Sequence, residues 1–359
     1  MADIQIPKTY KAAVYDKPGT ISTKIETLET PEPGPGQVLI NLTHSGVCHS
    51  DFGIMTSKWL HLPFPTKPGQ VGGHEGVGKI VKMGPGTENS GVKVGQRVGV
   101  KWVADVCSSC PPCLSGYDGQ CFAGKVSGYY TPGTFQQYVL GPAHYVTPIP
   151  DGVDSIQAAP MLCAGVTTYA ALRKSNAQSG QWVVMLGAGG GLGHIACQIA
   201  ARGMAMRVIG VDAAPKRQLV LDSGAEHFIA LPAPGGNGGV KELTGGLGAH
   251  AVLVLTAANA AYGSACDMLR FGGTVVCVGV PEGEPMPVRG CVPQYMIARA
   301  LHVVGVAVGN RREAIECLEL CQRGVVKVHC RTEPLENLTK VFEEMHSQQL
   351  QGRVVMDLS

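Results

Sequence analysis

The chain has 359 residues, 45% of them hydrophobic, which is enough for two domains that each bury a core. Its 29 basic and 27 acidic residues leave a net charge of +2 without a block of like charge, which argues against a nucleic-acid or membrane partner. No stretch approaches the roughly 18 apolar residues of a membrane span, and residues 1–11 lack a secretory pattern. The 13 cysteines are therefore expected to be metal ligands or core residues in a reducing compartment, and we expect a cytoplasmic protein.

The first 150 residues predict an irregular, β-rich domain, because they are rich in glycine and proline and contain short alternating runs such as 36–42 and 93–100. A helical segment over 151–171 follows and leads into a different pattern.

From residue 181 onward, short β-branched runs alternate with helical segments, which predicts a parallel, doubly wound sheet. The expected strands are 181–186, 207–211, 227–231, 251–256, 273–280 and 302–308. The glycine- and proline-rich piece 232–239 is predicted to be a surface loop. Two amphipathic helices at 312–323 and 335–346 and a strand at 352–357 are expected to complete the chain.

The strand at 182–186 runs directly into a glycine-rich turn and then a helical pattern, which is typical of a dinucleotide site. In the register that fits best, Ala188 takes the place of the first glycine of the fingerprint. The turn contains Gly187, Gly189, Gly190, Gly191, Leu192 and Gly193.

Asp212 lies 19 residues beyond Gly193, at the end of the next strand, where a carboxylate would bind a ribose 2′-hydroxyl and repel a 2′-phosphate. This favours NAD over NADP, with Lys216 near the adenosine ribose. The alternative is a turn that only packs strand against helix.

Four cysteines predict a structural zinc site, because a C-x2-C-x2-C-x7-C spacing brings four thiolates together with no vacant position. They are Cys107, Cys110, Cys113 and Cys121. A second set, Cys48, His74 and Cys163, is scattered, and spacing alone does not assemble it. A lone buried cysteine is usually a small core residue.

Several motifs together carry a family resemblance: 46–51 (GVCHSD), 72–76 (GGHEG), the cysteine lobe, 163–165 (CAG), the glycine turn with Asp212, and 278–281 (VGVP). Over nearly its whole length the chain resembles the zinc-containing medium-chain alcohol dehydrogenases of the microbial tetrameric type. The resemblance implies an α/β protein in which a GroES-like, β-rich catalytic domain (1–156 and 301–359) accompanies a Rossmann domain (157–300). It further implies an active site in the cleft between them, and a homotetramer whose subunits pair near 302–308.

The resemblance also implies the site residues. Cys48, His74 and Cys163 would hold a catalytic zinc, so that two zinc ions bind per chain. Glu75 would lie beside this zinc, Asp51 would orient the ligand histidine, and Ser50 would accept the hydroxyl proton of a zinc-bound alcohol on its way to an alkoxide. The cofactor contacts implied are His49 and Arg353 at the pyrophosphate, Thr167 near the nicotinamide, and the backbone of Val278 and Val280 at the carboxamide. For Arg353 and Thr167 an ordinary surface or turn role is about as plausible.

Trp59 and Trp102 match positions that narrow the alcohol cleft of this family, and Tyr129, Met296 and Cys291 are further pocket candidates that could equally be plain core. One departure stands out: the family's proton relay usually ends on a histidine three residues after Ser50, and this chain has Gly53 there. Protons would then leave through water, or His49 or another group would carry them.

The expected reaction is reversible hydride transfer between NAD and a primary or secondary alcohol, an aldehyde or a ketone. Gly53 keeps open the alternative of a specialised carbonyl reductase acting on a biosynthetic intermediate. A non-catalytic scaffold that binds zinc and dinucleotide is disfavoured, because it has no need for the open metal position of Cys48, His74 and Cys163.

Overall fold

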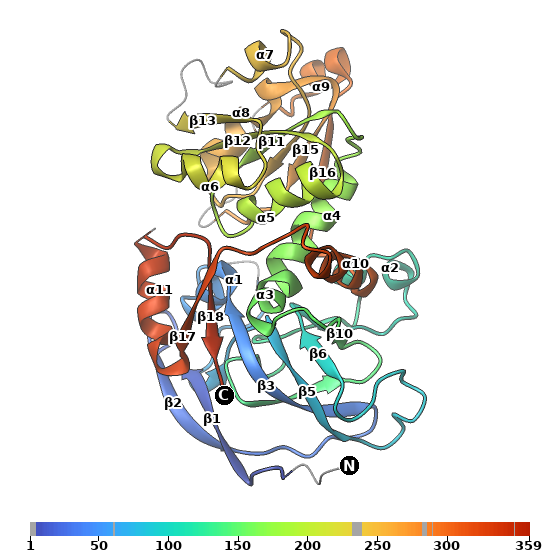
Figure 1. Cartoon of the computed structure of the whole chain (residues 1–359), viewed down its shortest axis with the longest axis vertical. Helices are drawn as coiled ribbons and strands as arrows, with labels where there is room; N and C mark the ends of the chain where they lie inside the picture. The colour runs from blue at the N-terminus through green and yellow to red at the C-terminus, as the bar shows by residue number, and fades with distance from the viewer. Residues whose placement is uncertain (1–4, 60–61, 232–238, 282–285, 289, 348) are drawn as a thin grey trace. The chain divides into compact units, whose positions relative to one another are not determined.

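The computed structural model describes residues 5–59, 62–231, 239–281, 286–288, 290–347 and 349–359 (Figure 1). The chain forms two compact units: the first comprises Met1–Cys163, Asn310–Gln322 and His329–Ser359, and the second comprises Ala164–Gly309 and Arg323–Val328. The surface loop predicted at 232–239 lies outside the described residues, apart from Gly239. Within the described ranges, no helix is long and apolar enough to cross a membrane.

The first unit is built around β3 (Gln37–Val47), a long strand whose residues are mostly buried. It pairs antiparallel with β5 (Gly76–Met83), β9 (Tyr138–Pro142) and β18 (Arg353–Asp357). The other described strands of this unit are β1 (Thr9–Tyr15), β2 (Thr23–Glu29), β4 (Gln70–Val71), β6 (Arg97–Val100), β7 (Val103–Asp105), β8 (Lys125–Val126), β10 (Thr147–Pro148) and β17 (Cys330–Pro334). The main sheet runs in the order β10-β6-β5-β3-β18-β17, and a smaller sheet runs β2-β1-β4. The β-rich character predicted for this part of the chain is confirmed.

Most of the described helices of the first unit bury side chains in its interior, whereas the short helix α2 (Pro111–Leu114) buries none. The helices of this unit are α1 (His49–Met55), α2, α3 (Ser155–Pro160), α10 (Arg311–Gln322) and α11 (Leu338–His346). Helix α11 buries Leu338, Val341 and Phe342, the i, i+3, i+4 face expected of an amphipathic helix. The ring of Phe342 lies 6.4 Å from that of Phe52 and 6.2 Å from that of Phe135, so α11 is attached to α1 through aromatic contacts.

The helical segment expected at 151–171 is present but irregular. Asp154 accepts a hydrogen bond from the backbone N–H of Ile156 and starts α3. A π-helical turn, Met161–Gly165, follows, and α4 (Val166–Lys174) continues from it into the second unit. Such wide turns are frequent at functional sites.

The second unit contains the predicted parallel sheet. Its six described strands run in the order β13-β12-β11-β14-β15-β16, and every pairing in it is parallel. Their bounds are β11 (Trp182–Leu186), β12 (Arg207–Ala213), β13 (His227–Leu231), β14 (Ala249–Val254), β15 (Leu269–Cys277) and β16 (His302–Gly305). The described helices after α4 are α5 (Gly193–Gln198), α6 (Arg217–Asp222), α7 (Val240–Leu243), α8 (Asn259–Ala265) and α9 (Pro293–Arg299). Helices α5 and α6 lie on one side of the sheet and α7 and α8 on the other, as in a doubly wound fold (Figure 1).

Some strand limits differ from the prediction. Strand β15 ends at Cys277 rather than at 280, because the N–H of Gly279 turns to the carbonyl of Val254. Strand β16 ends at Gly305 rather than at 308. Val308 has a left-handed φ of 48°, which is outside the range of a β-strand. Strand β17 was not predicted, since its sequence is mostly polar and exposed.

We expect replacement of Phe342 by alanine to lower the free energy of unfolding by about 3–5 kcal/mol, because the ring is fully buried between two other phenylalanines. Urea unfolding followed by circular dichroism measures the change. The control is Phe64→Ala in the same unit, where the side chain is 60% exposed, and its effect should stay within about 0.5 kcal/mol. Equal losses in both variants would contradict this account of the core.

Candidate functional site

Three residues that are far apart in the sequence meet in the interior of the first unit. Cys48 lies between β3 and α1, His74 follows β4, and Cys163 lies in the π-helical turn. The Sγ atoms of Cys48 and Cys163 are 3.9 Å apart, and His74 Nε2 is 3.2 Å from Cys163 Sγ. With a carboxylate oxygen of Glu75, one ligand atom from each residue lies within 4.8 Å of all the others, and all four residues are buried.

These separations fit a zinc ion. Ligand atoms about 2.3 Å (sulfur) and about 2.1 Å (nitrogen) from a tetrahedral zinc are themselves about 3.5 Å apart, close to the observed spacings. The chemistry of the donors also fits, because cysteine sulfur and histidine nitrogen are the usual protein ligands of zinc. A thiolate is the form that binds metal.

The carboxylate of Asp51 holds two members of this set in place. Its Oδ1 lies 2.8 Å from Nδ1 of His74, and its Oδ2 accepts a hydrogen bond of 2.9 Å from the backbone N–H of Cys48. The side chains of His74 and Asp51 are both buried. Because Nδ1 is engaged in this way, Nε2 of His74 is left facing the cysteine sulfurs, the orientation that a metal ligand needs.

Glu75 and Arg353 form a buried ion pair beside the cysteines, in which Nη2 of Arg353 donates to Oε1 of Glu75. Burial raises the pKa of Glu75 to about 7, although the guanidinium acts in the opposite direction. Among the described side chains, Oε2 of Glu75 and Nε of Arg353 have no hydrogen-bond partner. Gly46 must lack a side chain here, since a Cβ would lie 1.9 Å from Glu75 Oε2. The ion pair was not foreseen, because its members are 278 residues apart.

Helix α1 presents the two polar residues expected to handle protons. Ser50 Oγ lies 3.7 Å from Cys48 Sγ, so its hydroxyl is next to the metal-ligand set. His49 is exposed, and its ring stacks on Phe52 with 5.3 Å between centroids.

The candidate pocket residues fall into two groups. Trp102 packs edge-on against His74 at 4.9 Å between ring centroids, and Trp59 packs against Trp102 at 5.7 Å. Tyr129 belongs to the same unit and bonds the backbone of Phe64 through its hydroxyl. Met296 lies in α9 of the second unit. Cys291, in the same unit, faces Cys266, with 3.8 Å between the sulfurs.

The cysteine lobe forms a second cluster. Sγ separations of 3.5 Å (Cys110–Cys113), 3.6 Å (Cys107–Cys121) and 3.9 Å (Cys110–Cys121) again match a tetrahedral zinc. The pKa of Cys107 falls to about 6, because backbone N–H groups of Ser109 and Cys110 donate to its sulfur. The structure therefore brings together all four cysteines that the spacing predicted.

In the second unit, the glycine turn joins β11 to α5 as expected. Gly187 has a φ of 87°, and a Cβ on Gly193 would lie 2.1 Å from the carbonyl oxygen of Gly187, so both positions need glycine. Asp212 is the last residue but one of β12 and accepts hydrogen bonds from the N–H groups of Gly189 (2.8 Å) and Ala213 (2.7 Å). Lys216 Nζ lies 3.4 Å from this carboxylate.

The other proposed cofactor contacts are also in the second unit, except Arg353 and His49. Thr167 is buried in α4, while Val278 and Val280 follow β15. Between these valines, the carbonyl of Gly279 accepts a hydrogen bond from the hydroxyl of Tyr262.

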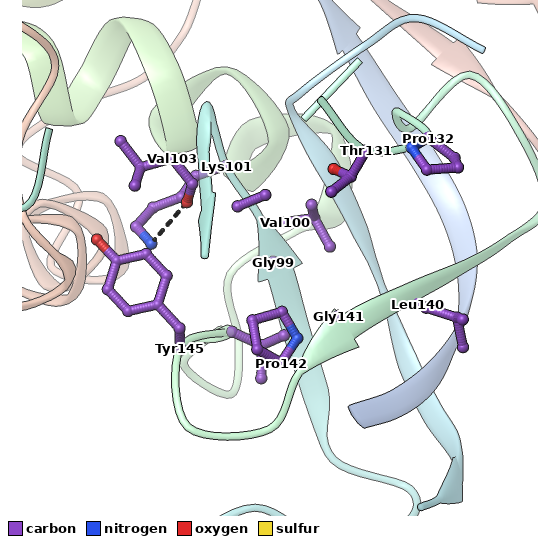
Figure 2. A pocket seen from close by; sticks show the side chains of 12 residues that line it. Gly99, Val100, Lys101, Val103, Thr131, Pro132, Leu140, Gly141, Pro142 and Tyr145 are labelled. Carbon is purple, nitrogen blue, oxygen red and sulfur yellow. Dashed lines mark hydrogen bonds between the residues drawn. The ribbon is translucent and has the colours of Figure 1, made fainter. Parts of the chain in front are cut away.

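Sequence reasoning missed a buried lysine. Lys101 Nζ lies 3.3 Å from the ring centroid of Tyr145 and donates to the carbonyl of Val103, beside a space of about 10 Å³ that is large enough for about one water molecule (Figure 2). Burial holds the pKa of Lys101 well below its usual value. The signal was available in the sequence as a lysine in the otherwise apolar run 98–103. None of the predicted site residues lines this space.

Comparison with known proteins agrees with this geometry. The alcohol dehydrogenase GroES-like domain family matches residues 34–151, and the zinc-binding dehydrogenase family matches residues 191–323. The chain is 62% identical to alcohol dehydrogenase 2 of Emericella nidulans, covering 100% of both chains. It is 39% identical to an alcohol dehydrogenase of Schizosaccharomyces pombe, covering 99% of both.

Two solved structures extend the comparison. The alcohol dehydrogenase of Aeropyrum pernix has a TM-score of 0.86 at 27% identity, covering 97% of this chain and 99% of that one. Acetophenone reductase of Geotrichum candidum, solved in complex with NAD, has a TM-score of 0.82 at 27% identity, with 98% of each chain covered. These matches confirm the predicted fold class, a GroES-like β-rich part with a Rossmann-type parallel sheet. The chain belongs to the zinc-containing medium-chain alcohol dehydrogenase family.

Proposed function

We propose that this chain is an NAD-dependent alcohol dehydrogenase that reversibly moves a hydride between NAD and a primary or secondary alcohol, or the corresponding aldehyde or ketone. The observation that carries the proposal is the buried meeting of Cys48, His74 and Cys163 with the hydroxyl of Ser50 beside them. Three protein ligands leave one tetrahedral position for a substrate oxygen.

Each residue of the site has a proposed role. Cys48, His74 and Cys163 would hold the metal, and Asp51 keeps the imidazole of His74 aimed at it. A zinc ion held there would lower the pKa of a bound alcohol, and NAD would supply the hydride acceptor. Ser50 Oγ is placed to accept the hydroxyl proton, and His49, its neighbour in α1, would pass the proton on.

The ion pair between Glu75 and Arg353 supports this assignment. A neutral or paired carboxyl next to two thiolates avoids a third uncompensated negative charge in a buried place. Arg353 keeps its Nε free for an anionic group, which is consistent with a pyrophosphate contact.

For the cofactor we propose NAD, bound at the turn that contains Gly187, Gly189, Gly190, Gly191, Leu192 and Gly193. The fixed carboxylate of Asp212 supports this choice, because it would oppose the charge of a 2′-phosphate. Lys216 beside Asp212, Thr167, and the backbone at Val278 and Val280 complete the proposed contacts.

We further propose that Cys107, Cys110, Cys113 and Cys121 hold a structural zinc. We also propose that the chain divides into a catalytic domain, residues 1–156 and 301–359, and a Rossmann domain, residues 157–300.

A cytoplasmic homotetramer is the proposed form. The edge strand β16, with its exposed Val303, and the exposed Ile297 of α9 support a subunit contact in this region. The proposed partners are small alcohols, aldehydes and ketones.

The direct test of function is a substrate screen on metal-analysed protein with NAD and NADP in both directions, followed by absorbance of the reduced nicotinamide. Turnover with NAD is expected. Under the same assay, Ser50→Ala should lose about 100-fold or more in kcat, because general acid–base groups contribute about 10²–10⁴. Ser179→Ala, which removes an exposed hydroxyl elsewhere, is the control. Full activity of Ser50→Ala with intact zinc content would rule out its proposed role.

Metal content tests the two zinc sites separately. We expect the wild type to bind two zinc ions per chain, and Cys163→Ala and Cys113→Ala each to lose one of them, since each removes a ligand from a different cluster. Inductively coupled plasma mass spectrometry gives the stoichiometry. Loss of both ions in each variant, with the fold intact by circular dichroism, would contradict two independent sites.

Cofactor preference tests Asp212. Asp212→Asn retains an acceptor for the N–H of Gly189 but removes the charge, so the ratio of kcat/KM for NADP to that for NAD should rise about tenfold, equivalent to about 1.4 kcal/mol. Asp267→Asn, an exposed carboxylate of the same unit, is the control. An unchanged ratio in Asp212→Asn would remove the main argument for NAD.

A further inference from the structure

The backbone conformation at residue 53 does not require a glycine. Gly53 lies inside α1, is buried, and has no positive φ, so an ordinary residue would suit the helix. What excludes a side chain is the indole of Trp59. A Cβ at residue 53 would lie 2.6 Å from Nε1, 2.8 Å from Cδ1 and 3.0 Å from Cε2 of Trp59, all too close for non-bonded atoms.

The chain after α1 holds the indole in this position. The N–H of Lys58 donates to the carbonyl of Gly53 (3.0 Å), immediately before Trp59 in the chain. Further along, the hydroxyl of Thr66 donates to the carbonyl of Ile54 (2.6 Å). The described residues on both sides of Trp59 are thus hydrogen-bonded to α1.

The indole is also the first member of a row of rings that reaches the metal-ligand set. Trp59 packs against Trp102 at 5.7 Å and 65°, and Trp102 packs against His74 at 4.9 Å and 82°. Edge-on contacts of this kind keep each ring in a defined place relative to the next. A displacement of Trp59 therefore changes the space in front of Trp102 and next to His74.

We propose that Gly53 is a specificity-determining residue, because its missing side chain lets the indole of Trp59 lie against α1 and so sets the width of the alcohol site beside His74. The inference rests on the proposed function. It assigns to Gly53 a steric role that is independent of any proton relay.

The direction of the effect follows from the contact. Ordinary van der Waals contact begins at 3.4 Å, so a methyl group at residue 53 must move the ring outward by about 1 Å. Since α1 blocks movement toward the helix, the indole is expected to move toward Trp102, the ring that it packs against. A narrower site should penalise an alcohol that is branched at the reacting carbon more than a slender one.

The test compares kcat/KM for ethanol and 2-butanol in the wild-type enzyme, Gly53→Ala, Trp59→Leu and the double variant. Gly53→Ala should lower the ratio of 2-butanol to ethanol by about tenfold, whereas in the Trp59→Leu background the same substitution should leave the ratio unchanged. The control is Gly263→Ala, another helical glycine, where a Cβ would meet nothing within 4 Å. An equal effect of Gly53→Ala on both alcohols, or the same effect with and without the indole, would overturn the proposal.

A second measurement does not depend on activity. The chain has three tryptophans, so Trp102→Phe/Trp182→Phe leaves Trp59 as the single indole fluorophore. Adding Gly53→Ala should shift its emission maximum and its acrylamide quenching, and Gly263→Ala should not. No turnover of any alcohol by the wild type would reject the proposed function alone, whereas unchanged fluorescence on Gly53→Ala would reject the steric coupling.

Discussion

The first unit depends on one buried carboxylate. Asp51 accepts from the backbone of Cys48 and faces the imidazole of His74, so it fixes the start of α1 and the direction of a metal-ligand candidate at the same time. Its own carbonyl accepts a hydrogen bond of 3.3 Å from the hydroxyl of Tyr15 on β1. That hydroxyl fills the space that a side chain on Gly72 would need. The need for glycine at position 72 is therefore a consequence of the hydrogen bond from Tyr15 to Asp51.

The same part of the molecule concentrates charge where water is absent. Two cysteines, a histidine and a glutamate are buried close together, and the glutamate forms an ion pair with a buried arginine. Isolated charges in such a place are costly, and pairing is what makes them tolerable. Arg353 at the start of β18 supplies the positive charge, and β18 is fixed by its pairing with β3 next to Cys48. The C-terminal strand is thus part of the site as well as of the sheet.

The sequence predicted those structural features that are determined by residues close together in the chain. The parallel sheet followed from β-branched runs, and the four lobe cysteines followed from short spacings. Cys48, His74 and Cys163 could be joined only through the family resemblance, because 89 residues separate the last two and no spacing rule spans that distance. The ion pair of Glu75 with Arg353 and the contact of Trp59 with Gly53 could not be predicted. Both depend on how distant or folded-back segments pack, and neither leaves a pattern in the chain.

The contact between Trp59 and Gly53 also constrains how this protein can change by mutation. Any side chain at residue 53, a relay imidazole included, would overlap with the present position of the Trp59 indole. The indole of Trp59 must be displaced or replaced for such a side chain to fit. The effect of a substitution at 53 therefore depends on which residue occupies position 59, so the two positions are expected to be epistatic.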